Sequence, residues 1–318
     1  MKISLLEEVR QILKLQRKSY RTEQSYSDWI YRFIVFHEQI PPSELREKEI
    51  GLFLHFLAKE RNASVATQNQ ALQAILFLYK HVLRIELKNA SLLRTRNPQR
   101  LPEVLSRNEI GSILKQLKGE VWLMTALLYG CGLRLSECVS LRVQDIDLNR
   151  SRLTIGLDKG NKERLLSLPE SIKVPLKEHV ETLRLRHQRC LSNGFCGVSL
   201  PNGMEKQAMQ ALCDWQWFYL FPADKPSVEP VSGKITLHHR SDSFLEKSIK
   251  EAVSKTSISG RISCNVFRHS FATHLLENGY SIHTVQTLLG HSDIRTTMVY
   301  TKVANSKLLV RSPLDDLD

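Results

Sequence analysis

The sequence predicts a mainly α-helical protein of two domains that also contains a small β-hairpin or sheet. At 318 residues, the chain is longer than a single hydrophobic core usually supports, so we expect two domains. Apolar residues recur at spacings of three and four along most of the chain, which indicates amphipathic helices. The stretch RLTIGLDKGNKERLLSL, residues 152–168, instead alternates apolar and polar residues around a polar, glycine-containing turn, which predicts a β-hairpin.

Residues 1–92 are expected to form a bundle of about four helices. Two apolar stripes mark helices, and they consist of Tyr26, Trp29, Phe33 and Phe36 and of Leu72, Ile75, Leu76, Tyr79 and Leu83. The Pro41-Pro42 pair separates the first stripe from the next helix, and Ser64 or Thr67 is expected to cap the helix after that. The cations of LKLQRKSYR, near the start of the chain, fit either a solvated helix face or a nucleic-acid contact.

The segment 93–101 is basic, contains proline and lacks periodicity, so we expect a linker there and a second domain at 102–318. Ser106 and Glu109 form a capping-box pattern at the start of that domain. The apolar run VWLMTALLYGCGL predicts a buried helix that ends in a glycine-rich break, and Arg134 opens the next helix. Further helices are expected after the hairpin and again towards the C-terminus.

Residues 190–240 lack periodicity and contain the stretches NGFCG, PNG and DWQWFYLFP. So long an irregular segment within a compact domain is usually functional or mobile. The six cysteines include no C-x-x-C pair, so we expect reduced thiols and no structural metal site.

The charge balance predicts a polyanionic partner. Lys and Arg number 45 and Asp and Glu 33, which gives a net charge of +12. This excess favours nucleic acid, with an anionic membrane surface as the second interpretation. The sequence has no apolar run long enough to span a membrane and no pattern of a signal peptide, so we expect a soluble, cytoplasmic protein.

Cleaving a DNA strand without a metal requires a nucleophile, cations that neutralise the phosphate oxygens and an acid for the leaving hydroxyl. The acidic residues are scattered among basic ones, so a two-metal nuclease site is not expected. Four side chains that are or can become cationic stand at helix starts or turn tips, where they suit phosphate oxygens: Arg134, Lys159, Arg268 and His291. Tyr300 follows His291 by nine residues. Each of these residues also has an ordinary structural explanation, and the pattern alone does not name an enzyme.

Four sequence boxes, in this order, resemble the tyrosine recombinases, also called phage-type integrases: GCGLRLSEC, LDKGNKER, NVFRHSFATHLL and LLGHSDIRTTMVYT. The stretch LPEVLSRNEI also resembles the start of the catalytic domain in that family. The resemblance implies an N-terminal helical SAM-like core-binding domain and a mixed α+β tyrosine recombinase catalytic domain, which together form a C-shaped clamp on DNA.

The resemblance also implies a role for each matching residue. Tyr300 would be the nucleophile and would form a 3′-phosphotyrosyl link. Arg134 and Arg268 would hold the non-bridging oxygens, Lys159 would be the general acid and His291 would assist at the phosphate. No metal or other cofactor is implied, because the phosphotyrosyl bond conserves the energy for religation.

Asn265 departs from the family motif H-x-x-R, because it stands where the family has histidine. If the position chiefly donates a hydrogen bond, we expect a loss of about 1–3 kcal/mol. If it must act as acid or base, we expect activity to fall by ~10² to 10⁴. Glu137 and His269 are expected to support the site, although His269 is expected to point to another face of its helix and not to replace the missing histidine.

The stretch MEKQAMQALCDWQWFYLFP, together with Pro230 and the pair His238-His239, resembles the additional segment of integron integrases. In that group the segment contacts bases extruded from folded single-stranded cassette sites. We therefore expect the histidine pair, and also Trp217 and Pro230, to bind DNA, although a core position is the stronger interpretation for Trp217. Gly156 stands where integron relatives often have a stacking aromatic, so that second contact is not expected.

The expected function is that of a site-specific recombinase that integrates or excises gene cassettes. It would act as a dimer on one site and a tetramer in the synapse, with the tail 302–318 docking onto a neighbouring protomer. Two alternatives stay open: a phage or chromosome-dimer-resolving recombinase acting on duplex sites, and a DNA-binding relic impaired by Asn265. The expected location is the bacterial cytoplasm, in association with the nucleoid.

Overall fold

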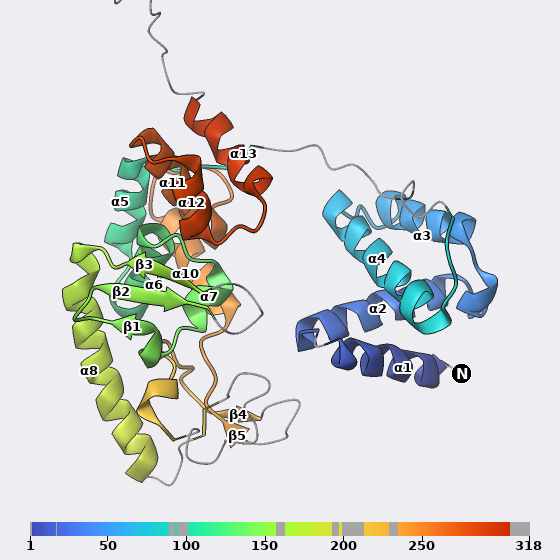
Figure 1. Cartoon of the computed structure of the whole chain (residues 1–318), viewed down its shortest axis with the longest axis horizontal. Coiled ribbons are helices and arrows are strands. Elements are labelled where there is room, and N and C mark those ends of the chain that lie inside the picture. Colours follow the sequence, from blue (N-terminus) through green and yellow to red (C-terminus); the bar gives the residue numbers. More distant parts are fainter. Residues whose placement is uncertain are drawn as a thin grey trace, which may run out of the picture. The chain divides into compact units, whose positions relative to one another are not determined.

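The chain folds into two compact units, Met1–Arg100 and Leu101–Asp318, in a computed structural model (Figure 1). The structure describes residues 2–16, 18–88, 93, 101–156, 163–192, 197–198, 213–228 and 235–305. Both units are mostly helical, and small sheets occur in the second. The predicted fold class is therefore confirmed. Most of the expected linker 93–101 and the tail from residue 306 onwards lie outside the described residues.

The first unit is a helical bundle. Its elements are α1 (Lys2–Leu15), α2 (Tyr20–Phe36), a 3-10 turn (Pro42–Glu44), α3 (Glu47–Lys59), α4 (Val65–Phe77) and a π-helical turn (Leu78–Leu83). Ser64, and not Thr67, caps α4, because its hydroxyl accepts the backbone N–H of Thr67 at 3.2 Å. The expected stripes face inward: Phe33 and Ile75 are fully buried, so burial of their apolar surface stabilises the bundle.

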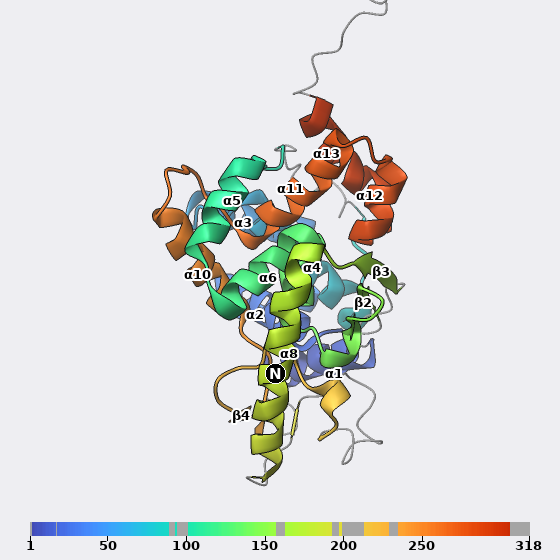
Figure 2. The same cartoon turned by 90° about the vertical axis from the view of Figure 1, so that its left-hand side faces the viewer.

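The second unit is built of helices that enclose a main core and a smaller apolar cluster. Its helices are α5 (Arg107–Gln116), α6 (Gly119–Gly130), α7 (Leu135–Val139), α8 (Glu170–Ser192), α10 (Asp242–Ser254), α11 (Cys264–Glu277), α12 (Ile282–Leu289) and α13 (Ile294–Asn305). The predicted capping box at the start of α5 is present, since the Glu109 carboxylate accepts the Ser106 N–H at 2.7 Å. The long helix α8 packs on α6 (Figure 2).

The predicted hairpin forms from β2 (Arg152–Ile155) and β3 (Arg164–Ser167), which pair antiparallel with Leu153 opposite Leu166. A third strand, β1 (Ile146–Asp147), extends it to the order β1-β2-β3. Beyond the end of β2, Gly156 approaches the opposite strand so closely that an added Cβ would lie 3.1 Å from the Glu163 Cα. Glycine therefore occupies this position, where integron relatives often have an aromatic residue, at a point where the two strand ends lie close together.

The segment 190–240 is more regular than expected where the structure describes it. It contains a 3-10 turn (Trp215–Trp217) and the short antiparallel pair β4 (Ser227–Val228) and β5 (Ile235–Thr236). These pieces are too short to leave a periodic pattern in the sequence, so they were not predicted.

Helix α11 is central to the site described next. It packs against α6, α10, α12 and α13, and both cartoon views place it beside α12 and α13 (Figures 1 and 2). Its buried face includes Phe267 and Ala272. The side chains of α11 therefore meet residues from four other helices of the unit.

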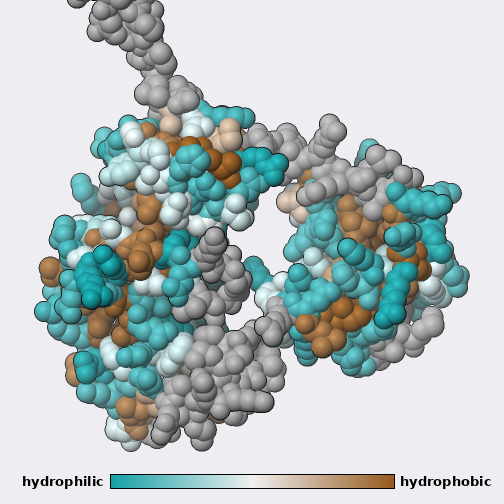
Figure 3. Space-filling model, viewed as in Figure 1, coloured by the Kyte–Doolittle hydropathy of each residue, from teal (hydrophilic) through white to brown (hydrophobic). Residues whose placement is uncertain are grey.

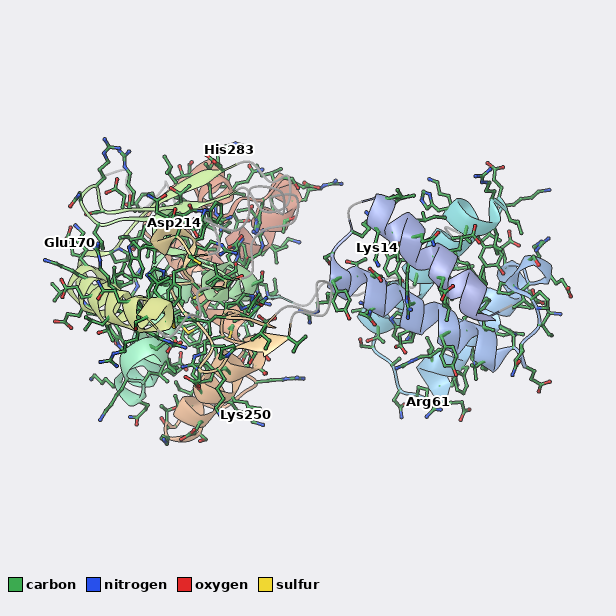
Figure 4. All side chains as sticks on the ribbon, turned by 90° about the horizontal axis from the view of Figure 1, so that it is seen from below. Lys14, Arg61, Glu170, Asp214, Lys250 and His283 are labelled. Atoms are coloured by element: carbon green, nitrogen blue, oxygen red, sulfur yellow. The ribbon has the colours of Figure 1, made fainter. Side chains whose placement is uncertain are left out.

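The surface is predominantly hydrophilic, with small hydrophobic patches on the face in view (Figure 3). Cations project from both units. Lys14 and Arg61 on the first unit and Lys250 on the second are exposed (Figure 4). This distribution agrees with the strongly basic composition.

Candidate active site

One partly buried carboxylate, that of Glu137, contacts three arginines. Arg134 caps α7 and donates to Glu137 from its backbone N–H and from a guanidinium nitrogen, both at 2.7 Å. Arg164, at the start of β3, makes two parallel hydrogen bonds to the same carboxylate, at 3.0 and 2.7 Å. Arg268 completes the cluster with an ion pair of 3.7 Å to Glu137. We call Glu137, Arg134, Arg164 and Arg268 the arginine cluster.

The arginine cluster keeps Glu137 ionised. Burial alone raises the pKa of its carboxyl, but the hydrogen bonds from Arg164 and Arg134 outweigh this effect and bring the pKa to about 2. The cluster thus holds three positive charges against one negative charge at neutral pH. Such an excess in a largely buried place favours binding of an anion such as a phosphodiester.

The backbone fixes Arg268 in place. Its guanidinium donates to the carbonyl of Gly132 at 2.6 Å and to that of Leu289 at 2.7 Å. Gly132 has a φ of +63°, and an added Cβ there would lie 2.3 Å from the ring of Phe271, so only glycine suits this position. Burial and the charge of Arg134 lower the pKa of Arg268 to about 10, which leaves it charged at neutral pH.

His291 follows the glycine that ends α12 and contacts Arg268. The guanidinium donates to His291 Nε2 at 3.2 Å, so this nitrogen carries no proton, and Nδ1 pairs with the hydroxyl of Thr297 at 2.8 Å. Burial and the charges of Arg268 and Arg134 lower the pKa of His291 to about 4. His291 is therefore neutral at neutral pH, and both of its ring nitrogens are occupied.

Tyr300, on α13, lies between two histidines. It is only 5% exposed, and its ring centroid is 6.4 Å from that of His291 and 5.5 Å from that of His269. Its hydroxyl makes a 3.0 Å hydrogen bond with His269 Nδ1. Burial raises the pKa of Tyr300, and Arg268 and Arg134 oppose this effect in part.

The orientation expected for His269 was wrong. Its side chain faces Tyr300, because α13 packs along α11 and brings the phenol to it. Asn265, one turn earlier on α11, is exposed. Its side chain has no hydrogen bond with the part of the chain that the structure describes, so nothing there shows it taking over the role of the family histidine.

The structure therefore brings together six of the expected residues: Arg134, Glu137, Arg268, His269, His291 and Tyr300. Lys159, at the tip of the hairpin, and Pro230, in the insertion, lie outside the described residues.

A second group of aromatic side chains lies in the insertion. Arg142 stacks its guanidinium on the ring of Tyr219 at 4.2 Å and on that of Trp217 at 5.5 Å. The ring centroids of His238 and His239 are 4.1 Å apart and lie 5.6 and 5.3 Å from that of Tyr219. We call these five residues the aromatic cluster.

Backbone pairing joins the aromatic cluster to the rest of the second unit. Leu220 donates to the carbonyl of Leu141 at 2.7 Å, and a bridge between Pro222 and His239 joins two parts of the insertion itself. Trp217 is half-buried and packs against the main core. The two histidines are also half-buried.

Comparison with known proteins now adds to this geometry. Residues 103–307 match the phage integrase family, and residues 5–89 match the N-terminal SAM-like domain of phage integrases. The chain belongs to the phage integrase family. Members of this family are tyrosine recombinases, enzymes that cut and rejoin DNA through a tyrosine-linked intermediate.

Relatives of this recombinase include proteins called integrase/recombinase from Escherichia coli and Pseudomonas aeruginosa. Each is 41% identical over 99% of this chain and 94% of its own length. The XerD tyrosine recombinase of Yersinia pestis is 32% identical over 73% of this chain and 68% of its own.

Solved structures agree with the fold of this recombinase. XerH bound to a palindromic difH substrate matches with a TM-score of 0.62 at 19% identity, over 95% of this chain and 81% of XerH. The Tn1549 transposon integrase in complex with transposon right end DNA matches with a TM-score of 0.60 at 15% identity, over 98% of this chain and 96% of that one.

Sequence reasoning missed Arg164 in the site of this recombinase. The residue lies in the LDKGNKER box, five positions after Lys159, and it looks like an ordinary strand residue. Its side chain is only 9% exposed and spans the gap to Glu137. A buried arginine needs an anionic partner, but a sequence alone does not show which arginines are buried.

Cys213 departs from the expectation of reduced thiols, since it takes part in a disulfide, whereas Cys131, Cys138, Cys190 and Cys264 are free. Among the described residues, no group of three or more His, Cys, Asp or Glu side chains is arranged to hold a metal ion. None of the described helices is both long and apolar enough to cross a membrane.

Proposed function

We propose that this tyrosine recombinase is of the integron-integrase type and that Tyr300 is its nucleophile. The phenol oxygen attacks the scissile phosphorus, a 3′-phosphotyrosyl bond forms and the bond to the 5′ oxygen breaks. The position of the Tyr300 hydroxyl beside the arginine cluster, which has a surplus of positive charge, supports this assignment.

The cations have separate tasks in this proposal. Arg134 and Arg268 bind the non-bridging oxygens, and the carbonyls that hold Arg268 aim it before DNA arrives, which lowers the cost of reorganisation. His291 assists by orienting Arg268 through Nε2. Lys159 donates the proton to the leaving 5′ oxygen. Glu137 and Arg164 position the two phosphate-binding arginines.

The observation that carries the integron assignment is the aromatic cluster. Three half-buried or buried rings, those of Tyr219, His238 and His239, lie within 6 Å of one another, in an insertion that is paired to the catalytic unit. Such a surface suits an extruded base, because stacking on aromatic rings contributes about 1–3 kcal/mol per base. His238 and His239 make the base contact, and Trp217 and Pro222 order the segment.

A duplex recombinase of the phage or Xer type is the second candidate. The similarity to XerD favours it, and it uses the same arginine cluster and the same tyrosine. Such a recombinase does not require the aromatic cluster, so the kind of DNA that the protein prefers distinguishes the two candidates. In either case the partner is bacterial DNA in the cytoplasm, and the strand exchange is carried out by a dimer on each site and a tetramer in the synapse.

The test uses two pools of suicide DNA, because the recognised sequence is not known in advance. One pool holds nicked duplexes with a randomised central segment, and the other holds folded single strands with extrahelical bases in a randomised stem. Covalent protein–DNA adducts are isolated under denaturing conditions and their DNA is sequenced. We expect adducts with the wild type, none with Tyr300→Phe, and at least tenfold more from the folded pool.

Substitutions of two histidines test the aromatic cluster, and the same substitution of an exposed histidine elsewhere is the control. His238→Ala and His239→Ala should each lower adduct formation on folded DNA by about 5- to 100-fold, which corresponds to the loss of one stacked base. His283→Ala, at an exposed histidine of α12 (Figure 4), should leave it unchanged. Equal yields from both pools would favour the duplex recombinase, and binding without any adduct would favour the catalytically impaired relic.

A further inference from the structure

We propose that His269 is the general base of strand cleavage in this protein, taking the proton of Tyr300 through Nδ1. This inference rests on the proposed role of Tyr300 as the nucleophile. It assigns the proton transfer that Asn265 is chemically unable to perform.

The geometry supplies the first argument. The hydroxyl of Tyr300 has a hydrogen bond of 3.0 Å to His269 Nδ1, which is within the reach required of a base. The two other nearby candidates are unsuitable. His291 has Nε2 occupied by Arg268 and Nδ1 by Thr297, and the amide of Asn265 does not accept a proton at neutral pH.

The protonation states supply the second argument. Burial raises the pKa of Tyr300, so the phenol is protonated at neutral pH and has to lose its proton before or during attack. Burial, together with the charge of Arg268, lowers the pKa of His269, so its imidazole is neutral and able to accept. On α11 the charged neighbour of His269 is Arg268, and the group that faces it from α13 is Tyr300.

The proton balance of the step is complete. The O–H bond of Tyr300 breaks as its proton moves to His269 Nδ1, while the phenol oxygen forms the bond to phosphorus. The bond from phosphorus to the 5′ oxygen breaks, and the 5′ oxygen takes its proton from the general acid. In rejoining, the 5′ hydroxyl gives its proton back to the group that acted as general acid as its oxygen bonds to phosphorus. The bond from phosphorus to the phenol oxygen breaks, and the imidazolium of His269 returns its proton to the departing phenolate.

The decisive variant is His269→Asn. The Oδ1 atom of asparagine accepts a hydrogen bond near the position of Nδ1, but the amide does not take up the proton. A residue that only positions Tyr300 would therefore tolerate this change, whereas a base would not. We expect single-turnover adduct formation at neutral pH to slow by about 10²- to 10³-fold, with unchanged DNA binding.

The pH profile adds a readout that a structural role would not move. In the wild type the rate should be level above about pH 6.5, because His269 is already neutral there. In His269→Asn the rate should rise about tenfold per pH unit between pH 7 and pH 9, because the phenol then has to ionise without a base. The substrate is a nicked suicide duplex or folded strand recovered from the pools above.

The chain offers a matched control on the same helix. His274 Nδ1 pairs with the hydroxyl of Tyr129 at 2.9 Å, so His274→Asn makes the same change to a second histidine–tyrosine pair outside the arginine cluster. We expect this variant to alter thermal stability and to keep the wild-type rate and pH profile. If His269→Asn itself fails to fold, His269→Gln replaces it.

A modified substrate distinguishes the loss of a general base from the loss of a general acid. When sulfur replaces the bridging 5′ oxygen, the leaving group departs without a proton, so the defect of His269→Asn should persist. A wild-type rate on that substrate, or a wild-type pH profile of His269→Asn on ordinary DNA, would overturn the proposal. Both results are distinguishable from failure of the proposed function, in which the wild type itself forms no adduct or Tyr300→Phe still does.

Discussion

Two charge clusters in the catalytic unit use the same residue types in opposite proportions. In the arginine cluster, three guanidiniums share the single carboxylate of Glu137. Near the end of the insertion, the single guanidinium of Arg240 is shared by two carboxylates, with Glu120 at 2.8 Å and Asp224 also in contact. Both arrangements fix arginine side chains, but only the first has positive charge left over.

The comparison separates a binding site from a structural clamp. Arg240 has its charge more than balanced by protein groups, so it requires no ligand and joins the insertion to α6. The arginine cluster has a surplus of positive charge that favours binding of an anion, because positive charges held together in a largely buried place repel one another. The balance of positive and negative charges around a buried arginine thus distinguishes an anion-binding site from a structural clamp. The mere presence of an ion pair does not, because both arrangements contain ion pairs.

The largest expected effect comes from removing the planar geometry of Arg268, one of the two arginines proposed to bind the phosphate. Arg268→Lys keeps the charge but loses the paired donors that reach Gly132, Leu289 and the substrate. We expect adduct formation on suicide DNA to fall by about 10³-fold. Arg240→Lys is the matched substitution, and it should change the rate by less than about threefold. Equal losses in both variants would erase the distinction between the clusters.

The next effect concerns stability. Glu137→Gln leaves three arginines without their shared carboxylate, so we expect the free energy of unfolding at pH 7 to drop by about 3 kcal/mol in urea denaturation. The folded pKa of Glu137, about 2, lies below its ordinary 4.5. Its stabilisation is therefore complete above pH 4.5 and is lost as the pH falls towards 2. The difference between wild type and variant should shrink over that range.

Glu120→Gln is the control for this measurement. It leaves Arg240 with Asp224 as a partner, so we expect a loss of only about 1 kcal/mol and an unchanged rate of adduct formation. A pH-independent difference between Glu137→Gln and the wild type would contradict the proposed role of the Glu137 charge.

The smallest effect tests directly whether the arginine cluster binds an anion. Inorganic phosphate at about ten times its dissociation constant stabilises a protein by about 1.4 kcal/mol, which corresponds to a rise of roughly 3–5 °C in the melting temperature of a unit of this size. We expect this rise in the wild type and in Arg240→Lys, compared with sodium chloride at equal ionic strength. Arg268→Lys should lose it, and an identical rise in all three proteins would show that the phosphate binds elsewhere.

Local signals explain what the sequence predicted well. The capping box of Ser106 and Glu109 and the alternation of residues in the hairpin depend on neighbours in the chain, so they are readable without a structure. The strand β1, with two residues, is too short to leave a periodic signal.

The site was predicted in its residue types and less well in its contacts. Tyr300, Arg134 and Arg268 came from the resemblance of the boxes, whereas Arg164 and the orientation of His269 depend on which helices and strands pack together. His269 lies four residues after Asn265, so both lie on one side of α11, and the docking of α13 decides which of them meets Tyr300. The sequence of a single motif does not show which helices and strands pack together in the folded protein.

The two carbonyls that hold Arg268 have a consequence for the making of the protein. Gly132 lies just after α6, and Leu289 is the last residue of α12. The guanidinium of Arg268 therefore joins two segments that are synthesised far apart in time. The tyrosine that would attack DNA follows later still, on α13. A growing or truncated chain therefore lacks both the aligned guanidinium of Arg268 and Tyr300. With the roles proposed for these residues, the ability to cut DNA appears only once nearly the whole catalytic unit has been synthesised and folded.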